Sequence, residues 1–133
     1  MELQLLAPNE TLFSGDVELI SGVSEEGSFG MLPRHLPAVM QLDTAPLKID
    51  TGESEHAFAV YGGFLVKERD ESLRVLTQGA KGKDELVEVD IKERIDEIEA
   101  KLEAEDIDES ERSELERALE KAQTDLMVVQ GEY

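Results

Sequence analysis

The sequence predicts a mixed fold, in which an N-terminal all-β sandwich or barrel is followed by a C-terminal antiparallel α-helical hairpin. Two observations support this prediction. All four prolines and nine of the ten glycines lie before residue 85, so turn signals are frequent in the first part and rare in the second. Apolar residues form short alternating runs in the first part and recur every three or four residues in the second. We therefore expect a β-sandwich domain over residues 1–84 and a helical hairpin over residues 85–133.

The first part contains five segments with the composition of β-strands. Each is a short run rich in β-branched and other apolar residues, bounded by turn signals such as Ala7-Pro8-Asn9 or Thr51-Gly52-Glu53. Short strands with frequent turns are typical of a sandwich or barrel. Gly62 and Gly63 interrupt the longest apolar stretch, which predicts a bend, a bulge or a close backbone approach there. The expected strands cover residues 2–6, 16–23, 46–50, 56–68 and 72–78.

The second part contains two helical stripes of similar length. Asp90 and Asp108 each precede a glutamate by three residues, a pattern that predicts helix N-termini at these two aspartates. Because the gap between the stripes is short, the helices should form an antiparallel hairpin and bury the stripes against each other. The core of such a hairpin is thin, so we expect it to be loosely attached to the sandwich and mobile. The stripes are Ile91, Ile95, Ile98 and Leu102, then Leu115, Leu119, Ala122, Leu126 and Val129.

The composition excludes several classes of function. Thirty-two acidic residues against thirteen Lys and Arg argue against binding to nucleic acid or to anionic lipid, because both need clustered cations. No apolar run approaches the ~20 residues that cross a bilayer, so we expect no direct membrane insertion. The absence of cysteine excludes disulfides and thiolate metal sites. The N-terminus lacks the basic region of a signal peptide, and the expected compartment is the cytoplasm.

No segment has the pattern of an active site, so we expect neither an enzyme nor a bound cofactor. Residues 79–85 lack the first glycine and the closing Ser or Thr of a phosphate-binding loop. Residues 106–111 lack the turn glycine of a calcium loop, and a helix cap explains them better. The two histidines do not have the spacing of a zinc site.

The segment GSFGMLPRHLP, from Gly27 to Pro37, differs from the rest of the chain because it has no carboxylate in a protein of net charge −19. Two glycines allow a tight turn, while Pro33 and Pro37 stiffen the second half of the segment. Ordinary loop architecture accounts for these residues. It does not account for the apolar side chains Phe29, Met31 and Leu32 beside a Pro-Arg-His. We therefore expect a rigid contact surface here.

Three short motifs occur in order along the chain. Gly27, Gly30, Met31, Leu32, Pro33, His35 and Pro37 form the first, Gly62, Gly63 and Phe64 the second, and Gly82 and Asp84 the third. This arrangement resembles the epsilon subunit of rotary F-type ATP synthases. In that family a Gly-x-x-Gly-Ile-Leu-Pro-x-His-x-Pro segment precedes a Gly-Gly-Phe strand, and Gly-x-Asp leads into a helical hairpin. Residues 28–35 also resemble an alternative bacterial and archaeal branch of these synthases.

The resemblance implies a non-catalytic rotor subunit in the central stalk of a proton- or sodium-translocating synthase, at the cytoplasmic face of the cell membrane. It implies that the sandwich clamps the gamma subunit and rests on the c-ring. The hairpin would either fold onto the sandwich or extend along gamma toward the catalytic alpha and beta subunits, where it suppresses ATP hydrolysis. The residues that the family's geometry brings near the polar loops of the c-ring are Ser28, Met31, Arg34 and His35.

Two departures from the family concern the hairpin. The family's ATP-binding pattern is Ile/Leu-Asp-x-x-Arg-Ala, whereas here Arg94 stands one residue too far and is followed by Ile95, so ATP binding is not expected. Inhibitory docking in the family uses basic residues of the second helix, and repulsion by the many neighbouring carboxylates argues against it here. The candidate regulatory residues are Arg112, Arg117 and Lys121. The alternative function is a soluble acidic adaptor whose hairpin binds another coiled-coil partner.

Overall fold

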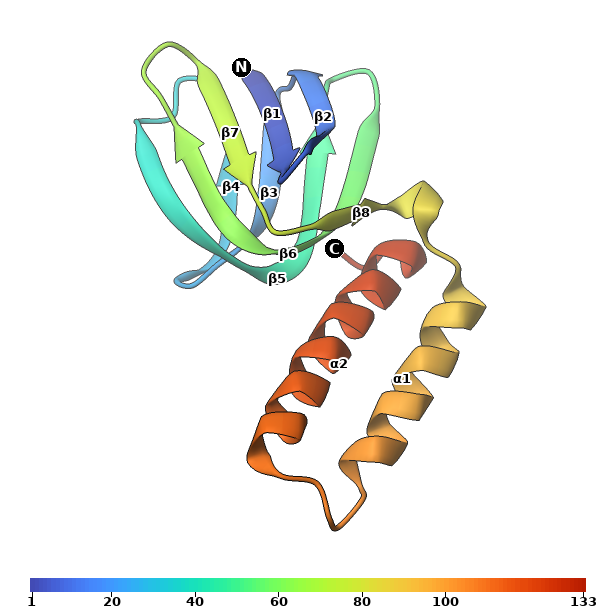
Figure 1. Cartoon of the computed structure of the whole chain (residues 1–133). Helices are drawn as coiled ribbons and strands as arrows, with labels where there is room; N and C mark the ends of the chain where they lie inside the picture. The colour runs from blue at the N-terminus through green and yellow to red at the C-terminus, as the bar shows by residue number, and fades with distance from the viewer.

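The structure is a computed structural model that describes residues 1–133, and it contains a curled β-sandwich with a helical hairpin projecting from one end (Figure 1). The predicted fold class is confirmed. The strands are β1 Glu2–Ala7, β2 Glu10–Asp16, β3 Leu19–Ser24, β4 Gly27–Met31, β5 Ala38–Asp50, β6 Glu55–Lys67, β7 Ser72–Leu76 and β8 Ala80–Gly82. A short 3-10 helix, η1 Lys83–Glu85, leads into α1 Glu88–Leu102 and α2 Glu109–Gln130.

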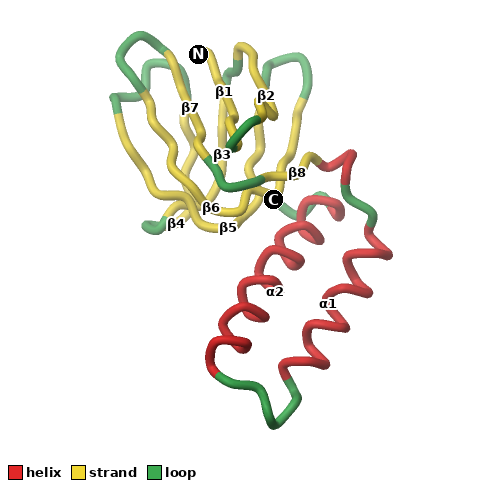
Figure 2. Tube along the Cα trace, in the orientation of Figure 1, coloured by secondary structure: helices red, strands yellow, loops and turns green.

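The two long strands, β5 and β6, organise the sheet. They pair with each other along nearly their whole length. On its other edge β5 pairs with β3, whereas β6 pairs with β8 through Phe58–Val60 and with β7 through Phe64–Lys67. The strand order is β2-β1-β7-β6-β5-β3-β4, and only the β1–β7 pair is parallel. A strand that pairs with different neighbours along its length must curl. The sheet therefore wraps around one apolar core (Figure 2).

The core of the sandwich is a cluster of apolar side chains. Alternate residues of β1, β3, β5, β6 and β7 point into it, as the period of two along a strand requires. Burying a side chain of this size contributes about 1.5–3 kcal/mol, so this cluster dominates the stability of the sandwich. Its thirteen buried members are Met1, Leu3, Leu5, Val17, Ile20, Met31, Leu42, Leu47, Ile49, Val60, Leu65, Leu73 and Val75.

Of the three alternatives that the sequence allows at the glycine pair in β6, a bend, a bulge or a close backbone approach, the structure shows a close backbone approach. Gly62 and Gly63 have φ angles of 77° and 137°, which residues other than glycine rarely adopt. A Cβ atom on Gly63 would overlap the carbonyl oxygen of Leu76 in the neighbouring strand. The pair therefore lets β6 bend while β7 stays bonded to it.

Four strand predictions were wrong or incomplete. β2, Glu10–Asp16, was missed, because it is an edge strand without strict alternation that is held by its register with β1. The strand expected over 16–23 begins at Leu19, and the one expected over 46–50 extends back to Ala38. Gly27–Met31, expected as part of a loop, forms β4 and pairs with β3 from Ile20 to Ser24.

The hairpin has the two facing stripes that the sequence predicts. Ile91, Ile95 and Ile98 of α1 are buried together with Ala122 of α2, and the remaining stripe residues pack around them. Asp108 caps α2, since its Oδ1 accepts a hydrogen bond from the N–H of Glu111 at 2.8 Å. The predicted cap at Asp90 was wrong: α1 begins at Glu88, and Asp90 lies in its first turn, where a carboxylate is favourable next to the helix dipole.

The hairpin contacts the sandwich through a small area near the end of α2. Val128 is buried against Ala57 and Ala59 of β6, with Tyr61 and Leu86 at the edge of this cluster. The rest of the hairpin projects away from the sandwich (Figures 1 and 2). Neither helix is long and apolar enough to cross a membrane.

We propose that residues 1–84 form a domain that folds without residues 85–133. The thirteen-residue core contains no residue of the hairpin. Removal of the hairpin therefore exposes only the small patch around Ala57 and Ala59. A chain truncated after Asp84 should unfold in one cooperative thermal transition, with a stability lower than that of the whole chain by about 2 kcal/mol. A truncated chain without a cooperative transition would contradict the proposed boundary.

Candidate functional site

The segment from Gly27 to Pro37 divides at Met31 into a strand, whose last residue is buried, and an exposed loop. Met31 is 1% exposed and points into the core, so its predicted role as a surface contact is wrong. The six residues from Leu32 to Pro37 are all exposed. They connect β4 to β5 at the end of the sandwich that is remote from the hairpin (Figure 1). The stiff exposed part of the predicted contact surface is therefore residues 32–37.

Ser28 lies apart from Arg34 and His35. It is exposed on β4 and pairs with Val23 of β3. It lines a hollow of about 340 Å³ that also includes Met127 and Tyr133, from the C-terminal end of the chain. The structure thus brings Arg34 and His35 together at one end of β4 and leaves Ser28 beside the hairpin.

Exposed apolar side chains surround Arg34 and His35. Leu32 is 58% exposed, Leu36 79% and Val39 71%. We call these five residues, Leu32, Arg34, His35, Leu36 and Val39, the loop surface. Leu36 and Val39 were not among the predicted contacts. Leu36 could have been found in the sequence, because it brackets Pro-Arg-His together with Leu32. Large apolar side chains that gather at such exposure commonly mark a binding surface.

The shape of the loop depends on Glu71 in the β6–β7 turn. Arg34 and Glu71 have left-handed φ angles of 70° and 67°, which are strained for residues with side chains. The backbone N–H of Arg34 donates to both carboxylate oxygens of Glu71, at 3.2 Å each. The ammonium of Lys67, whose side chain is 1% exposed, lies 3.5 Å from the same carboxylate. Glu71 thereby holds the loop against the neighbouring turn.

These contacts lower the pKa of Glu71. The hydrogen bond from the Arg34 backbone is the main cause, and the charge of Lys67 adds to it. Because the pKa of this carboxylate is lower in the folded protein, its contacts stabilise the loop at pH values above its ordinary pKa of 4.5. This contribution is lost as the pH falls through the lower pKa of the folded protein. We therefore expect acid to release the loop.

Hydrogen exchange checks this prediction. Between about pH 6 and about pH 3, protection of the Arg34 amide should fall, after correction for the intrinsic pH dependence of exchange. The variant Glu71→Gln cannot titrate, so protection of its Arg34 amide should show no such step. The same step in both proteins would show that Glu71 does not hold the loop.

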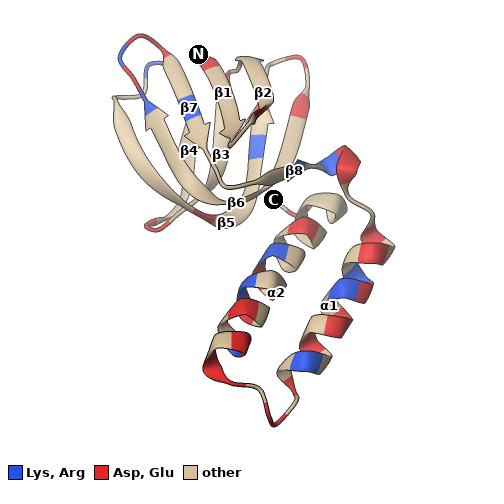
Figure 3. Cartoon of the chain, in the orientation of Figure 1, with Lys and Arg blue, Asp and Glu red and all other residues tan.

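The end of the sandwich around the loop surface carries cations without partners. The carboxylates of the β6–β7 turn are occupied within the chain, since Glu68 pairs with Arg74 at 2.6 Å and Asp70 accepts from Ser72 at 2.6 Å. In contrast, neither Arg34 nor Arg69 has a carboxylate oxygen within ion-pair distance. Basic residues gather at this end while the hairpin is mostly acidic (Figure 3). An apolar and basic surface favours a partner with exposed carboxylates.

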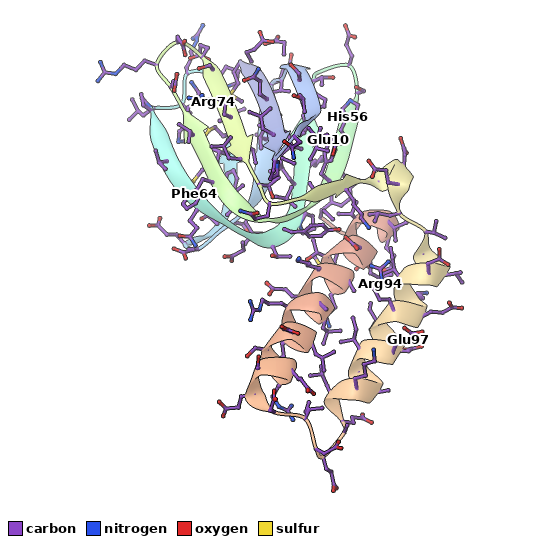
Figure 4. The ribbon with its side chains drawn as sticks, in the orientation of Figure 1. Glu10, His56, Phe64, Arg74, Arg94 and Glu97 are labelled. Atoms are coloured by element: carbon purple, nitrogen blue, oxygen red, sulfur yellow. The ribbon has the colours of Figure 1, made fainter.

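A second exposed apolar area lies on the outer face of β6 and β7. Phe64, of the Gly-Gly-Phe motif, is 49% exposed and stands directly opposite Leu76, which is 44% exposed. Phe64 points outward from the sheet (Figure 4). Val66 lies on the same face and pairs with Val39 of the loop surface. The apolar area is therefore continuous from the loop surface onto the face of the sheet.

The three candidate regulatory residues of the hairpin do not form one cluster. Lys121 lies near the sandwich, with its ammonium 5.4 Å from the centre of the Tyr61 ring. Arg112 and Arg117 lie nearer the free end of α2 and are exposed, and Arg117 bonds only to the backbone of Ser113. Only Lys121 faces the sandwich in this arrangement.

A buried polar contact joins the hairpin to the sandwich, and sequence reasoning missed it. Asp125 of α2 is 1% exposed. Its Oδ1 accepts a 2.6 Å hydrogen bond from the hydroxyl of Tyr61, and its Oδ2 lies 3.4 Å from Nη1 of Arg94. Figure 4 shows Arg94 on α1, facing α2. The available signal was that Asp125 falls on the buried side of α2, three residues after Ala122 and three before Val128.

Groups that could hold a metal or a phosphate are not gathered in the structure. No three His, Asp or Glu side chains are placed together to bind a metal ion. Residues 79–85, which superficially resemble a phosphate-binding loop, form β8 and η1 instead.

Comparison with known proteins gives a consistent family. Residues 1–83 match the family described as "ATP synthase, Delta/Epsilon chain, beta-sandwich domain". The chain is 35% identical over 117 residues to the ATP synthase epsilon chain 1 of Nitrobacter hamburgensis, which covers 88% of this chain and 82% of that relative. It is 33% identical over 81 residues to the ATP synthase epsilon chain of Brevibacillus brevis. That match spans 60% of this chain and only 61% of the relative's length.

Two solved structures are similar in fold. A chain in the structure of the Euglena gracilis mitochondrial ATP synthase, "OSCP/F1/c-ring", superposes with a TM-score of 0.81 at 25% identity, over 92% of this chain and 76% of that chain. A chain in the structure of the Tetrahymena thermophila mitochondrial ATP synthase, "central stalk/cring", has a TM-score of 0.63 over 96% of this chain and 95% of that chain. Its identity is 12%, so this second similarity concerns the fold alone.

Proposed function

The chain belongs to the family of F-type ATP synthase epsilon subunits, and from this premise we propose that it is a non-catalytic rotor subunit linking the gamma subunit to the c-ring. The rotor belongs to a synthase that translocates protons or sodium ions. The chain then lies at the cytoplasmic face of the cell membrane, as a peripheral part of the complex. The observation that carries the proposal is the pair of exposed surfaces on an otherwise acidic sandwich.

The loop surface is the proposed contact with the c-ring. It lies at the end of the sandwich remote from the hairpin (Figure 1), so a ring bound there leaves the hairpin free. Glu71 and Lys67 hold its shape, and two prolines limit its flexibility. A contact that transmits rotation needs this rigidity, because a flexible loop would lose its register under load. Arg34 and His35 supply the polar contacts, and Leu32, Leu36 and Val39 the apolar area.

The outer face of β6 and β7 is the proposed contact with gamma. Phe64 and Leu76 are half-exposed there, and aromatic side chains are enriched in protein interfaces. Because this area continues from the loop surface through Val66 and Val39, one sandwich can hold both partners at once. This continuity supports a linking role.

The hairpin is the proposed regulatory element, and the catalytic alpha and beta subunits are its proposed partners. Arg112 and Arg117 are exposed near its free end, where a subunit on the hairpin side of the sandwich would contact them. Five glutamates lie within the same stretch of α2, namely Glu109, Glu111, Glu114, Glu116 and Glu120. Their charge opposes binding to acidic catalytic subunits, so inhibition by this hairpin should be weak. No observation favours the alternative adaptor function over the rotor role.

Reconstitution tests the proposed function. The full chain, mixed with purified gamma subunit and c-ring in detergent, should co-sediment with both. Mixtures without gamma or without the ring show whether the chain binds each partner on its own. The rotor role would be wrong if the chain bound neither partner while remaining folded.

A further inference from the structure

One carboxylate connects the hairpin to the sandwich. Asp125 is the only acidic residue among the 26 buried residues. Its two oxygens contact different elements, Tyr61 of β6 at 2.6 Å and Arg94 of α1 at 3.4 Å. One side chain of α2 therefore contacts both α1 and the distant strand β6.

The apolar contact around Asp125 is small. Only Ala57, Ala59 and Val128 are buried there, with Tyr61 and Leu86 partly covered. Two alanines and one valine bury little area, so apolar burial favours the docked hairpin only weakly. The hydroxyl of Thr124 reaches the backbone of Thr44 at 3.4 Å, which is a long hydrogen bond. The polar contacts of Asp125 must therefore decide where the hairpin sits.

Burial of Asp125 specifies the position of the hairpin, but it also costs free energy. A buried carboxylate loses its hydration, and it recovers this loss only when strong partners surround it. Here it has one short hydrogen bond and one long ion pair with Arg94, whose side chain is 45% exposed. Removing one partner of such a group leaves a buried charge uncompensated, whereas a neutral group of the same shape avoids the cost. The contact thus specifies one geometry while adding little stability.

We propose that Tyr61 and Asp125 form a latch that holds the hairpin on the sandwich in one position, and that the charge of Asp125 keeps this docked position only marginally favoured. When the hairpin undocks, the carboxylate of Asp125 becomes hydrated again. The free energy of this hydration offsets the loss of the hydrogen bond to Tyr61. The inference deepens the proposed regulatory role of the hairpin. Its test measures docking in the isolated chain, so its failure would leave the proposed rotor role untouched.

The charged groups around Tyr61 give the latch a dependence on alkaline pH. Burial, and then the hydrogen bond to Asp125, raise the pKa of Tyr61 above its ordinary value of about 10. The charge of Arg94 opposes this shift, while Glu85 adds to it, and Lys121 lies over the ring. A raised pKa means that the contribution of Tyr61 to docking is fully present below about pH 10 and is lost as the pH rises through the pKa of docked Tyr61.

Distance measurements between two labels test the latch. The chain contains no cysteine, so Glu53→Cys in the β5–β6 turn and Glu105→Cys at the tip of the hairpin provide the only two thiols. Spin labels on both should give a distance distribution in which a narrow peak from the docked hairpin exceeds a minor undocked population. Tyr61→Phe should broaden it and shift the ratio of docked to undocked hairpin at least about tenfold toward the undocked form. Asp125→Asn retains an acceptor for Tyr61 without the charge, so its docked population should equal or exceed that of the parent.

Tyr133→Phe is the matched control. It removes the only other tyrosine hydroxyl in the chain, from a residue that is 47% exposed, and should leave the distances unchanged. Distances in Tyr61→Phe equal to those of the parent would overturn the latch. If Asp125→Asn opened the hairpin as widely as Tyr61→Phe does, the claim that the charge weakens docking would be wrong.

An alkaline titration tests the same latch without changing its residues. In the Tyr133→Phe background Tyr61 is the sole tyrosine, and the chain has no tryptophan, so the phenolate absorbance reports Tyr61 alone. The label distances should widen over the pH range in which this absorbance rises. Ionisation of Tyr61 with the hairpin still docked would overturn the proposal.

Discussion

The double variant Arg34→Glu/His35→Glu is expected to bind the gamma–c-ring assembly about tenfold more weakly than the parent chain at low salt, with an unchanged melting temperature. Both side chains are exposed and form no ion pair within the chain. Reversing charges at the edge of an interface turns attraction into repulsion, and exposed pairs are worth ~0.2–1 kcal/mol each. Two such reversals give a loss on the order of 1.4 kcal/mol, which corresponds to tenfold.

The salt dependence separates this explanation from a general loss of structure. Screening shortens the range of charge interactions to ~8 Å at physiological ionic strength, so the difference between variant and parent should shrink as salt is added. The control Gln78→Glu/Lys81→Glu makes the same change of formal charge at exposed positions on the hairpin side of the sandwich. It should bind like the parent. Equal binding by parent and variant at both salt concentrations would show that residues 32–37 are only a turn.

Gly63→Ala is expected to destabilise the protein by about 3–4 kcal/mol. The added Cβ atom would overlap the Leu76 carbonyl oxygen, and the backbone of Gly63, at φ 137°, is one that alanine avoids. Backbone strain of this kind costs about 1–3 kcal/mol, and overpacking adds a similar amount. Because Leu65 and Val75 next to it are core residues, the strands cannot separate without opening the core. Thermal unfolding should show a melting temperature lower by about 10 °C or more.

Gly30→Ala provides the matched control, and it concerns a glycine of the first motif. Gly30 lies in β4 without a positive φ, and the nearest atom to an added Cβ is a side-chain carbon of Leu19 at 3.6 Å. That is ordinary contact, so this change should alter stability by less than about 1 kcal/mol. Similar losses for Gly63→Ala and Gly30→Ala would mean that the close approach of β6 and β7 does not constrain the fold.

The loop segment shows which features local patterns can and cannot predict. The exposed Pro-Arg-His and the stiff prolines were visible in the sequence, because they are properties of consecutive residues. The strand β4 was not, because it forms only through pairing with β3. The inward direction of Met31 follows from that pairing, and so does the separation of Ser28 from Arg34. Pairing depends on residues distant in the chain, and no local signal reports it.

The sequence by itself determined the fold class, the two facing stripes of the hairpin, the cap at Asp108 and an irregularity of the strand at Gly62 and Gly63. Each follows from periodicity or backbone freedom within a few residues, and such local preferences act before the chain is folded. Only the tertiary structure decided which polar groups meet. Arg34 and Glu71 are separated by 37 residues, and Tyr61 and Asp125 by 64. Their contacts exist because the packed apolar core brings the strands and helices into register, and the polar groups are satisfied only at the positions where that packing leaves them.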